Sequence, residues 1–327
     1  MIEASGLTKR YGRTLAVDDL SFTVAPGRVT GFLGPNGAGK STTMRMMLGL
    51  DRPNSGDVRI GGQHYAELKR PLHTVGALLD AKWTHPNRSA RAHLRWLARS
   101  NKISLKRVDE VLELVGLTEV ADKRAGGYSL GMSQRLGIAA ALLGDPQVLL
   151  FDEPVNGLDP EGIAWIRTFM QSLAAQGRTV FVSSHLLSEM AITATELVVI
   201  GRGRLITQCS TAEFVENATE ATVRVRSPQA DRLRAALTSQ GRTVTEVDGG
   251  LVVVGATSQE IGELAAKHGF VLHELTMQRG SLEQAFMQMT GQAVEFHAAA
   301  AAPPSEAAQQ QLDAMATMQG GPGRTQP

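Results

Sequence analysis

The sequence predicts an α/β protein on a largely parallel sheet, followed by a small α+β domain and a disordered tail. Short apolar runs that are typical of buried strands alternate with helical patterns over residues 1–215. Residues 216–291 change to a shorter alternation of strands and helices. The remaining segment, 292–327, is rich in Ala, Gln, Pro and Gly, and it lacks the large apolar side chains that build a core. These observations define three regions of the chain.

Length and composition fit about two folded domains and exclude several classes of protein. The chain has 327 residues, and a domain usually takes roughly 100–200. Its 33 Lys and Arg side chains balance 32 Asp and Glu, which gives no support for a nucleic-acid partner. A single cysteine, Cys209, excludes an internal disulfide framework. No apolar run approaches the ~18 residues of a membrane span, so we expect any work at a membrane to depend on another polypeptide.

Four short apolar runs are predicted to be strands of the parallel sheet. They are Val29–Leu33, Val148–Phe151, Thr179–Ser183 and Leu197–Ile200. Their continuous apolar character is typical of strands that are covered on both faces. Residues 88–115 have instead a helical pattern throughout. We therefore expect a helical subdomain, spanning about 82–135, between the strands.

The small domain is predicted to follow the order β-α-β-β-α-β. Its strands are Thr222–Arg226, Thr243–Val247, Leu251–Val254 and Phe270–Leu275, and its helices are Gln229–Ser239 and Ser258–His268. Asp248-Gly249-Gly250 joins the two middle strands, because Asp-Gly and Gly-Gly pairs favour tight hairpins. This order matches the ferredoxin-like motif. A last helix is predicted over Ser281–Met289.

A glycine-rich loop follows the first predicted strand and opens a helix over Ser41–Leu48. The loop fits the pattern G-x-x-x-x-G-K-[ST] with Gly34, Pro35, Asn36, Gly37, Ala38, Gly39, Lys40 and Ser41. The glycines let backbone N–H groups surround phosphate oxygens, and the helix amino terminus adds partial positive charge. Lys40 can reach the β- and γ-phosphates, and Ser41 can bind Mg²⁺. A glycine-rich turn with a chance lysine would not require the strand–loop–helix order found here.

Two acidic residues follow a buried strand and complete the expected site. Asp152 and Glu153 come directly after Val148–Phe151. Asp152 is placed to hold the Mg²⁺ shell, and Glu153 is placed to orient or activate the attacking water. An Asp-Glu pair alone could be a solvated turn. After four apolar residues, and in a chain with the phosphate loop, the pair predicts hydrolysis of a nucleoside triphosphate.

Further motifs resemble those of ATP-binding-cassette (ABC) ATPases. The segment YSLGMSQR, residues 128–135, resembles the LSGGQ signature of that family and precedes Asp152 and Glu153 as it does there. Its candidate residues are Ser129, Leu130, Gly131, Met132 and Gln134. The other matches are Gly157, Leu158 and Asp159 for the D-loop, His185 for the switch histidine and Tyr11 for the aromatic that stacks on adenine. The resemblance covers residues 1–215 as an ordered set.

The resemblance implies ATP and Mg²⁺ as cofactors and a second copy of the chain as a partner. The loop residues and Thr42 would bind ATP, and the signature turn would cover the γ-phosphate held by the partner cassette. Ser129 and the backbone at Gly131 suit that role, because they precede a predicted helix, Gln134–Leu143, whose amino terminus favours anions. His185 would contact the γ-phosphate and hold the catalytic glutamate and the water in line. The dimer would drive separate polytopic transmembrane permease subunits from the cytoplasmic face of the cell membrane.

Two positions depart from the family pattern. Asp80 stands where the Q-loop normally has a glutamine. Because carboxylates suit Mg²⁺, Asp80 is a candidate metal ligand beside Ser41 and Asp152; if the loop is shifted, it is merely solvated. Leu130 and Met132 replace a glycine and the glutamine of the signature. The SLGM form is similar to that of bacitracin-resistance exporters, so we expect ATP still to be enclosed.

The carboxyl-terminal region favours an exporter. Gly280–Gly291 is similar to the ending LEDVFLxLTG of drug-resistance exporter ATPases of the daunorubicin and bacitracin type. Arginines at helical spacing form either a face for the permease or a solvated charged face: Arg88, Arg91, Arg95 and Arg99. We therefore expect the ATP-hydrolysing motor of an exporter of drugs, antibiotics or lipid-like substrates. The alternatives are an importer motor, a soluble non-transport ABC ATPase and a non-hydrolysing regulatory cassette.

Overall fold

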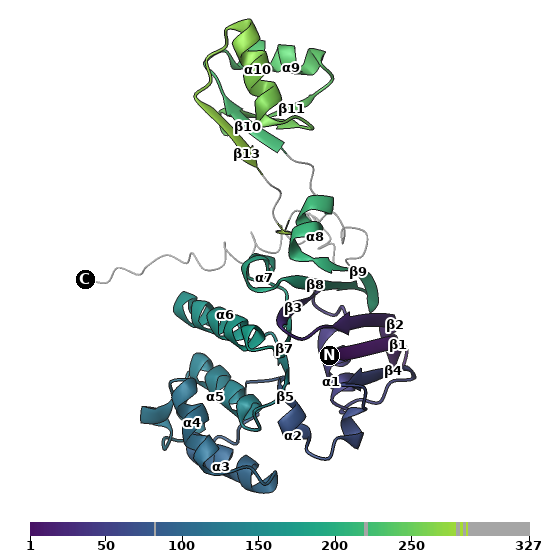
Figure 1. The fold of residues 1–327 in the computed structure, drawn as a ribbon, viewed down its shortest axis with the longest axis vertical. Helices are drawn as coiled ribbons and strands as arrows, with labels where there is room; N and C mark the ends of the chain where they lie inside the picture. Colours follow the sequence, from purple (N-terminus) through teal and green to yellow (C-terminus); the bar gives the residue numbers. More distant parts are fainter. Residues whose placement is uncertain (82, 219–221, 279–281, 284–285, 287–327) are drawn as a thin grey trace, which may run out of the picture. The chain divides into compact units, whose positions relative to one another are not determined.

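A six-stranded, mostly parallel sheet forms the centre of the first region in this computed structural model (Figure 1). The structure describes residues 1–81, 83–218, 222–278, 282, 283 and 286. The strand order is β5 (Val75–Leu78), β6 (Val148–Asp152), β7 (Thr179–Ser184), β3 (Arg28–Leu33), β8 (Glu196–Gly201) and β9 (Arg204–Ser210), and only β9 runs antiparallel to its neighbour. The four predicted strands are confirmed. Because β3 and β6 flank β7 in the same direction, their carboxyl ends lie at one edge of the sheet.

A three-stranded antiparallel sheet, which the sequence did not predict, shares a core with the parallel one. Its order is β2 (Thr14–Val24), β1 (Ile2–Tyr11) and β4 (Ser55–Ile60). Side chains alternate between buried and exposed over residues 20–24 of β2, as a half-covered strand requires. Phe22 of β2 meets Phe32 and Phe181 of the parallel sheet at ring-centroid distances of 5.5 and 5.6 Å. Helix α1 (Lys40–Met47) follows the phosphate loop, and its buried methionines belong to the same core. This packing holds the start of the helix in place beside the loop.

The helical subdomain is confirmed, but its helices have other bounds than predicted. It contains α3 (Ala90–Ser100), α4 (Lys106–Leu114) and α5 (Leu130–Leu142), with the short helices η2 (Thr118–Val120) and η3 (Ala125–Gly127) between the last two. Two further short helices, η1 (Tyr65–Glu67) and α2 (Pro71–Thr74), precede β5 outside the subdomain. The prediction of an unbroken helical segment over 88–115 is wrong, because Lys102 takes a φ of 56° and ends the first helix there. Helix α5 begins four residues before its predicted start, because Ser129 caps it by accepting a hydrogen bond from the Met132 N–H.

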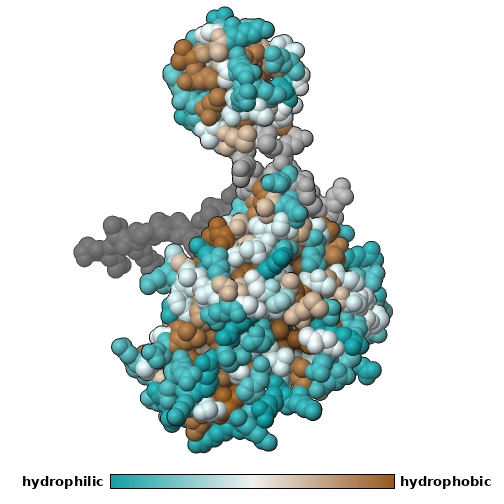
Figure 2. Space-filling model, viewed as in Figure 1, coloured by the Kyte–Doolittle hydropathy of each residue, from teal (hydrophilic) through white to brown (hydrophobic). Residues whose placement is uncertain are grey.

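Further helices pack beside the parallel sheet. Both α6 (Pro160–Ala175) and α7 (Leu187–Thr193) contact β3, and α8 (Thr211–Ala218) follows β9. On the face drawn in Figure 2, hydrophobic residues form small groups that hydrophilic ones separate. No helix in the described part of the chain is long and apolar enough to cross a membrane.

The small domain has the predicted βαββαβ order. Its antiparallel sheet has the order β11 (Thr243–Val247), β12 (Gly250–Val254), β10 (Thr222–Arg226) and β13 (Glu274–Gln278), and its helices are α9 (Ala230–Ser239) and α10 (Ser258–His268). The predicted last strand, 270–275, is displaced: Phe270 and Leu272 pack against the domain core, and pairing with β10 starts at Glu274. Apolar residues before the strand produced this error, since local pattern does not encode a pairing partner.

Several predictions on the carboxyl-terminal part of the chain stay predictions. The tail, 292–327, and most of the predicted helix over 281–289 lie outside the described residues. The domain boundaries after 215 and 291 also stay predictions.

Candidate nucleotide-binding site

The loop between β3 and α1 borders a pocket of about 220 Å³. The pocket is lined by Ala16, Asn36, Gly37, Ala38, Gly39, Lys40, Ser41, Thr42 and Glu153. A Cβ at Gly39 would lie 2.5 Å from the Ala16 carbonyl oxygen, and one at Gly34 would lie 2.7 Å from that of Ile200. Gly39 also has a φ of 102°, which favours glycine. At positions 34 and 39 the loop therefore requires glycine, because neighbouring backbone leaves no room for a side chain.

Lys40 places a buried cation at this pocket. The residue is 7% exposed, and its Nζ donates hydrogen bonds to the carbonyl oxygens of Gly34 at 2.7 Å and Pro35 at 3.3 Å. The ammonium lies 3.5 Å from the Oε1 atom of Glu153. Burial lowers the pKa of Lys40, and the Glu153 carboxylate opposes that shift. A phosphate group in the pocket would give this charge a nearer anionic partner.

Glu153 lies between two of the other predicted site residues. It follows the last residue of β6, and its Oε2 atom is 2.8 Å from the Nδ1 atom of His185. Its other oxygen faces Lys40. The backbone φ of Glu153 is 48°, which is uncommon for a residue with a Cβ. The fold thus brings Lys40, Glu153 and His185 together from three distant parts of the sequence.

Ser183, on β7, is a site residue that sequence reasoning missed. Its hydroxyl donates to the Oδ1 atom of Asp152 and accepts a hydrogen bond from the Glu153 N–H at 2.9 Å. The available signal was a pair of serines directly before His185. It was not informative without knowing that β6 and β7 are neighbours.

The residues at the pocket fit Mg²⁺ bound together with phosphate. In proteins Mg²⁺ usually takes one or two carboxylates with substrate phosphate oxygens and water, and needs no cage of protein ligands. Ser41 supplies a hydroxyl at the pocket, and Asp152 supplies a carboxylate at the end of β6. Among the residues that the structure describes, no group of three or more His, Cys, Asp or Glu could hold a metal alone. These oxygens therefore suit a metal that arrives with a nucleotide.

Tyr11, at the end of β1, stands beside the helix that follows the loop. Its hydroxyl donates to the Oδ2 atom of Asp51 at 2.7 Å. Arg45 of α1 donates to the same Asp51 oxygen at 2.7 Å. Burial and the Asp51 carboxylate raise the pKa of Tyr11. The residue is 45% exposed, and the Lys9 ammonium lies over its ring, 5.0 Å from the centroid. A base would have to stack on the part of the ring that Lys9 leaves open.

The signature segment forms the amino terminus of α5 and touches the D-loop segment of the same chain. Ser129 caps the helix and is exposed. A Cβ at Gly157 would lie 2.4 Å from the Leu130 side chain, and one at Gly131 would lie 3.5 Å from that of Leu158. The two motifs that the sequence predicted separately are therefore in contact.

The remaining residues of these two motifs have structural contacts. Asp159 caps α6 by accepting a hydrogen bond from the Gly162 N–H at 2.8 Å. Gln134 is 6% exposed and faces the interior, with no hydrogen-bond partner for its Oε1 atom among the described residues. Met132 packs partly buried against the large core cluster. Ser129 and Leu130 are the exposed side chains of the turn.

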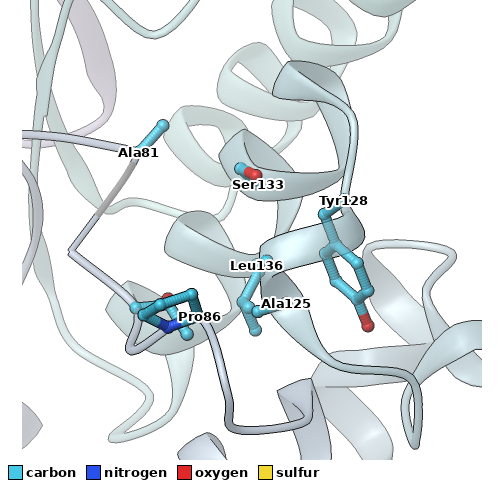
Figure 3. A pocket seen from close by; sticks show the side chains of 8 residues that line it. Ala81, Pro86, Ala125, Tyr128, Ser133 and Leu136 are labelled. Carbon is cyan, nitrogen blue, oxygen red and sulfur yellow. The ribbon is translucent and has the colours of Figure 1, made fainter.

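A second pocket, of about 280 Å³, lies behind the signature turn (Figure 3). Tyr128, Ser133 and Leu136 line it from the signature segment and α5, and Ala81 and Pro86 line it from the loop after β5. The two segments that border the pocket therefore face each other across an opening. This arrangement places the signature turn next to the loop in which Asp80 lies.

Asp80 does not line the phosphate pocket. It is exposed and lines a third pocket, of about 320 Å³, together with Trp83, His93 and Trp96. Its metal-binding role stays a prediction, and the structure gives that role no geometric support. Arg91 does not lie on an open arginine face of the kind that the sequence analysis considered for the permease or for solvent. It pairs with Asp109 and Asp122 inside the helical subdomain.

Family models and curated relatives match most of the chain. A model described as ABC transporter matches residues 17–156, and one described as a domain of unknown function matches 221–283. An uncharacterized ABC transporter ATP-binding protein of Bacillus subtilis, YhcH, is 38% identical over 302 residues, covering 90% of this chain and 97% of that protein. The bacitracin transport ATP-binding protein BcrA of Enterococcus faecalis is 36% identical over 297 residues, covering 89% of this chain and 96% of that protein.

Solved structures share the fold of the first region. An ATP-binding subunit of an ABC transporter superposes with a TM-score of 0.61 at 25% identity, covering 66% of this chain and 92% of that one. A dimeric bacterial ABC transporter cassette superposes with a TM-score of 0.59 at 23% identity, covering 64% of this chain and 99% of that one. At this identity the second match supports the fold alone.

Proposed function

This chain is an ATP-binding protein of the ABC transporter family, and on that premise we propose that it hydrolyses ATP to drive antibiotic export through a separate permease. The observation that carries the proposal is the meeting of Lys40, Glu153 and His185 beside the glycine loop. Similarity to BcrA, which is named for bacitracin transport, supports an antibiotic as the cargo. The permease would hold the chain at the cytoplasmic face of the membrane.

Nucleotide binding is assigned to the loop and Tyr11. The β- and γ-phosphates lie against the Lys40 ammonium, which the loop carbonyls and Glu153 surround in the free protein. The adenine stacks on the exposed ring of Tyr11. Mg²⁺, held by Ser41 and Asp152, would neutralise phosphate charge. Uptake of the triphosphate replaces a weak ion pair at Lys40 by a stronger one.

Hydrolysis is assigned to Glu153. Its carboxylate accepts a proton from water while the water oxygen bonds the γ-phosphorus and the bridge to the β-phosphate breaks, giving ADP and phosphate. His185, 2.8 Å away, orients that carboxylate. Since Lys40 is within 3.5 Å of the same carboxylate, phosphate binding also releases Glu153 from its ion pair and leaves it available to the water.

A second copy would complete the site. The exposed turn at the start of α5 carries Ser129, Leu130 and Gly131, and its helix amino terminus favours the γ-phosphate of the partner. Met132 and Gln134 face their own chain and would support the turn. Closure of the dimer on ATP is then a shift in population driven by the ligand.

The permease is proposed to dock at the third pocket. Trp83 and Trp96 border it and are 61% and 51% exposed, and Arg88 lies over the Trp96 ring at 4.9 Å. Exposed tryptophans at a pocket are typical of protein interfaces. Trp96→Glu should abolish co-purification of the co-expressed permease and leave ATPase activity of the free chain unchanged. Leu114→Glu, at a position that is 48% exposed on α4, is the control. If both variants lose co-purification of the permease equally, the docking assignment is wrong.

Glu153→Gln tests the function directly. The variant loses the base but keeps the nucleotide pocket, so it should bind ATP, stop releasing phosphate and accumulate as a dimer. Size-exclusion chromatography with ATP and Mg²⁺ measures the dimer, and a phosphate assay measures turnover. Glu113→Gln, an exposed glutamate of α4, is the control. If Glu153→Gln releases phosphate at the wild-type rate, the proposed function is wrong.

A further inference from the structure

Ser183 is a buried hydroxyl that connects both acidic residues of the site. It lies opposite Asp152 in the parallel pairing of β6 with β7. The residue is 0% exposed. Its Oγ atom donates a hydrogen bond to the Oδ1 atom of Asp152 and accepts one from the backbone N–H of Glu153 at 2.9 Å. The hydroxyl proton and one acceptor lone pair are both used, so the two partners determine its orientation.

Glu153 depends on such an anchor because its backbone is strained. A φ of 48° lies in the left-handed region, where the Cβ of an L-residue is crowded. This conformation persists only where the surroundings hold it. It directs the carboxylate to Lys40 and His185. A relaxed backbone would turn the carboxylate away from both.

We infer that Ser183 is a positioning residue for ATP hydrolysis, holding the Asp152 carboxylate and the Glu153 backbone in their working geometry. The inference rests on the function proposed above. Ser183 is not among the residues that line the phosphate pocket, so it acts through the two acidic residues. Its loss should therefore affect the chemical step and leave ATP affinity almost unchanged.

Substitution of Ser183 tests this separation. Ser183→Ala should lower kcat by roughly 10–100-fold, the usual effect of losing a hydrogen bond to a ligand or catalytic group, while KM for ATP stays within about twofold. Affinity for a fluorescent ATP analogue without Mg²⁺ should not change. Ser183→Thr and Ser183→Val form a pair of equal size that differs in the hydroxyl. Ser183→Thr should keep most of kcat, and Ser183→Val should lose as much of it as Ser183→Ala.

A double-mutant cycle gives a readout that does not depend on turnover. In the wild type, loss of Ser183 lets the strained Glu153 backbone relax, and this relief offsets part of the lost hydrogen-bond energy. Glu153→Gly has already removed the Cβ and with it the left-handed strain, so Ser183→Ala should lower the midpoint of thermal unfolding more in that background than in the wild type. Thr179→Val is the matched control. Thr179 lies at the other end of β7, is 1% exposed and contacts neither acid, so its loss should affect stability alone.

The outcomes separate this inference from the proposed function. If Ser183→Thr and Ser183→Val give the same kcat, or if Ser183→Ala destabilises both backgrounds equally, Ser183 is only a core residue and the inference is wrong. The proposed function would still stand as long as Glu153→Gln stops hydrolysis. If Glu153→Gln hydrolyses ATP normally, the function itself fails, whatever Ser183 does.

Discussion

Tyr11 and the phosphate loop are joined through one carboxylate, that of Asp51. The Tyr11 hydroxyl and the Arg45 guanidinium both donate to its Oδ2 atom, each at 2.7 Å. Arg45 lies on α1, the helix that also carries Lys40 and Ser41. These hydrogen bonds lower the pKa of Asp51, because Arg45 and Tyr11 favour its charged form. These contacts restrain the Tyr11 side chain in the free protein, which would reduce the entropy lost in the stacking proposed above.

Asp51→Asn should weaken ATP binding without slowing hydrolysis. The lost charge-assisted hydrogen bonds contribute on the order of 1–3 kcal/mol, and we expect KM for ATP to rise about three- to tenfold with kcat unchanged. Inorganic triphosphate has no base, so its inhibition constant should not change. Asp122→Asn, which removes an ion pair of Arg91, is the control. If the inhibition constant of triphosphate rises as much as KM for ATP, the substitution acts on the phosphate loop and not on Tyr11.

The first residue of helix α5 forms the contact between the signature segment and the D-loop segment. This residue, Leu130, is exposed to 39%, yet its Cδ2 atom occupies the space beside Gly157. Gly157 has a φ of 72°. A leucine at the first position of the signature helix therefore fits only a glycine on the facing segment. The pair gives a physical reason for the unusual SLGM form, since the larger side chain fills a contact that a glycine would leave empty.

Gly157→Ala should destabilise the chain more than a glycine substitution elsewhere. The left-handed backbone costs about 1–2 kcal/mol, and the clash with Leu130 adds about 1–3 kcal/mol. Gly177→Ala measures the first cost alone, because Gly177 has a φ of 88° and no atom near its Cβ position. Urea unfolding gives both values. In a Leu130→Ala background the excess should vanish; an excess that survives there would rule out the contact as its cause.

The large core cluster joins residues between Val29 and Phe214 with two residues near the end of the described chain. It includes strands of the parallel sheet, helices of the helical subdomain and, after the small domain, Leu282 and Phe286. Phe214 of α8 belongs to the same cluster. The chain therefore leaves the cassette core after α8 and contributes to it again after β13. Residues of that core therefore stand on both sides of the small domain in the sequence.

Phe286→Ala should destabilise the whole chain. Phe286 is 8% exposed, and truncating a buried phenylalanine usually costs about 3–5 kcal/mol. We expect a lower midpoint of thermal unfolding, measured by circular dichroism on the full-length protein. Val271→Ala is the control, at a position that is 52% exposed. If both variants melt at the wild-type temperature, Phe286 does not contribute to the core in solution.

Local sequence patterns were sufficient for much of the site and the fold. The glycine loop, the acids after a buried strand and the βαββαβ order depend on residues that are near each other in the chain. In the antiparallel sheet, the pairing of β4 with β1 was missed because β4 lies far along the chain from this partner. The start of β13 was missed for a related reason, since Glu274 is defined by its pairing with Arg226.

The sequence by itself determined that this chain carries the phosphate loop of an ATP-binding protein, and it predicts which residues would hold the phosphates. Those residues are contiguous, and a short loop with glycines before a helix has the same chemistry wherever it folds. Only the tertiary structure decided that Ser183 holds Asp152 and Glu153, that Leu130 meets Gly157 and that Asp80 lies at another pocket. Each of these facts depends on which strands and helices become neighbours. That choice is made by packing over the whole core, and no local pattern records it.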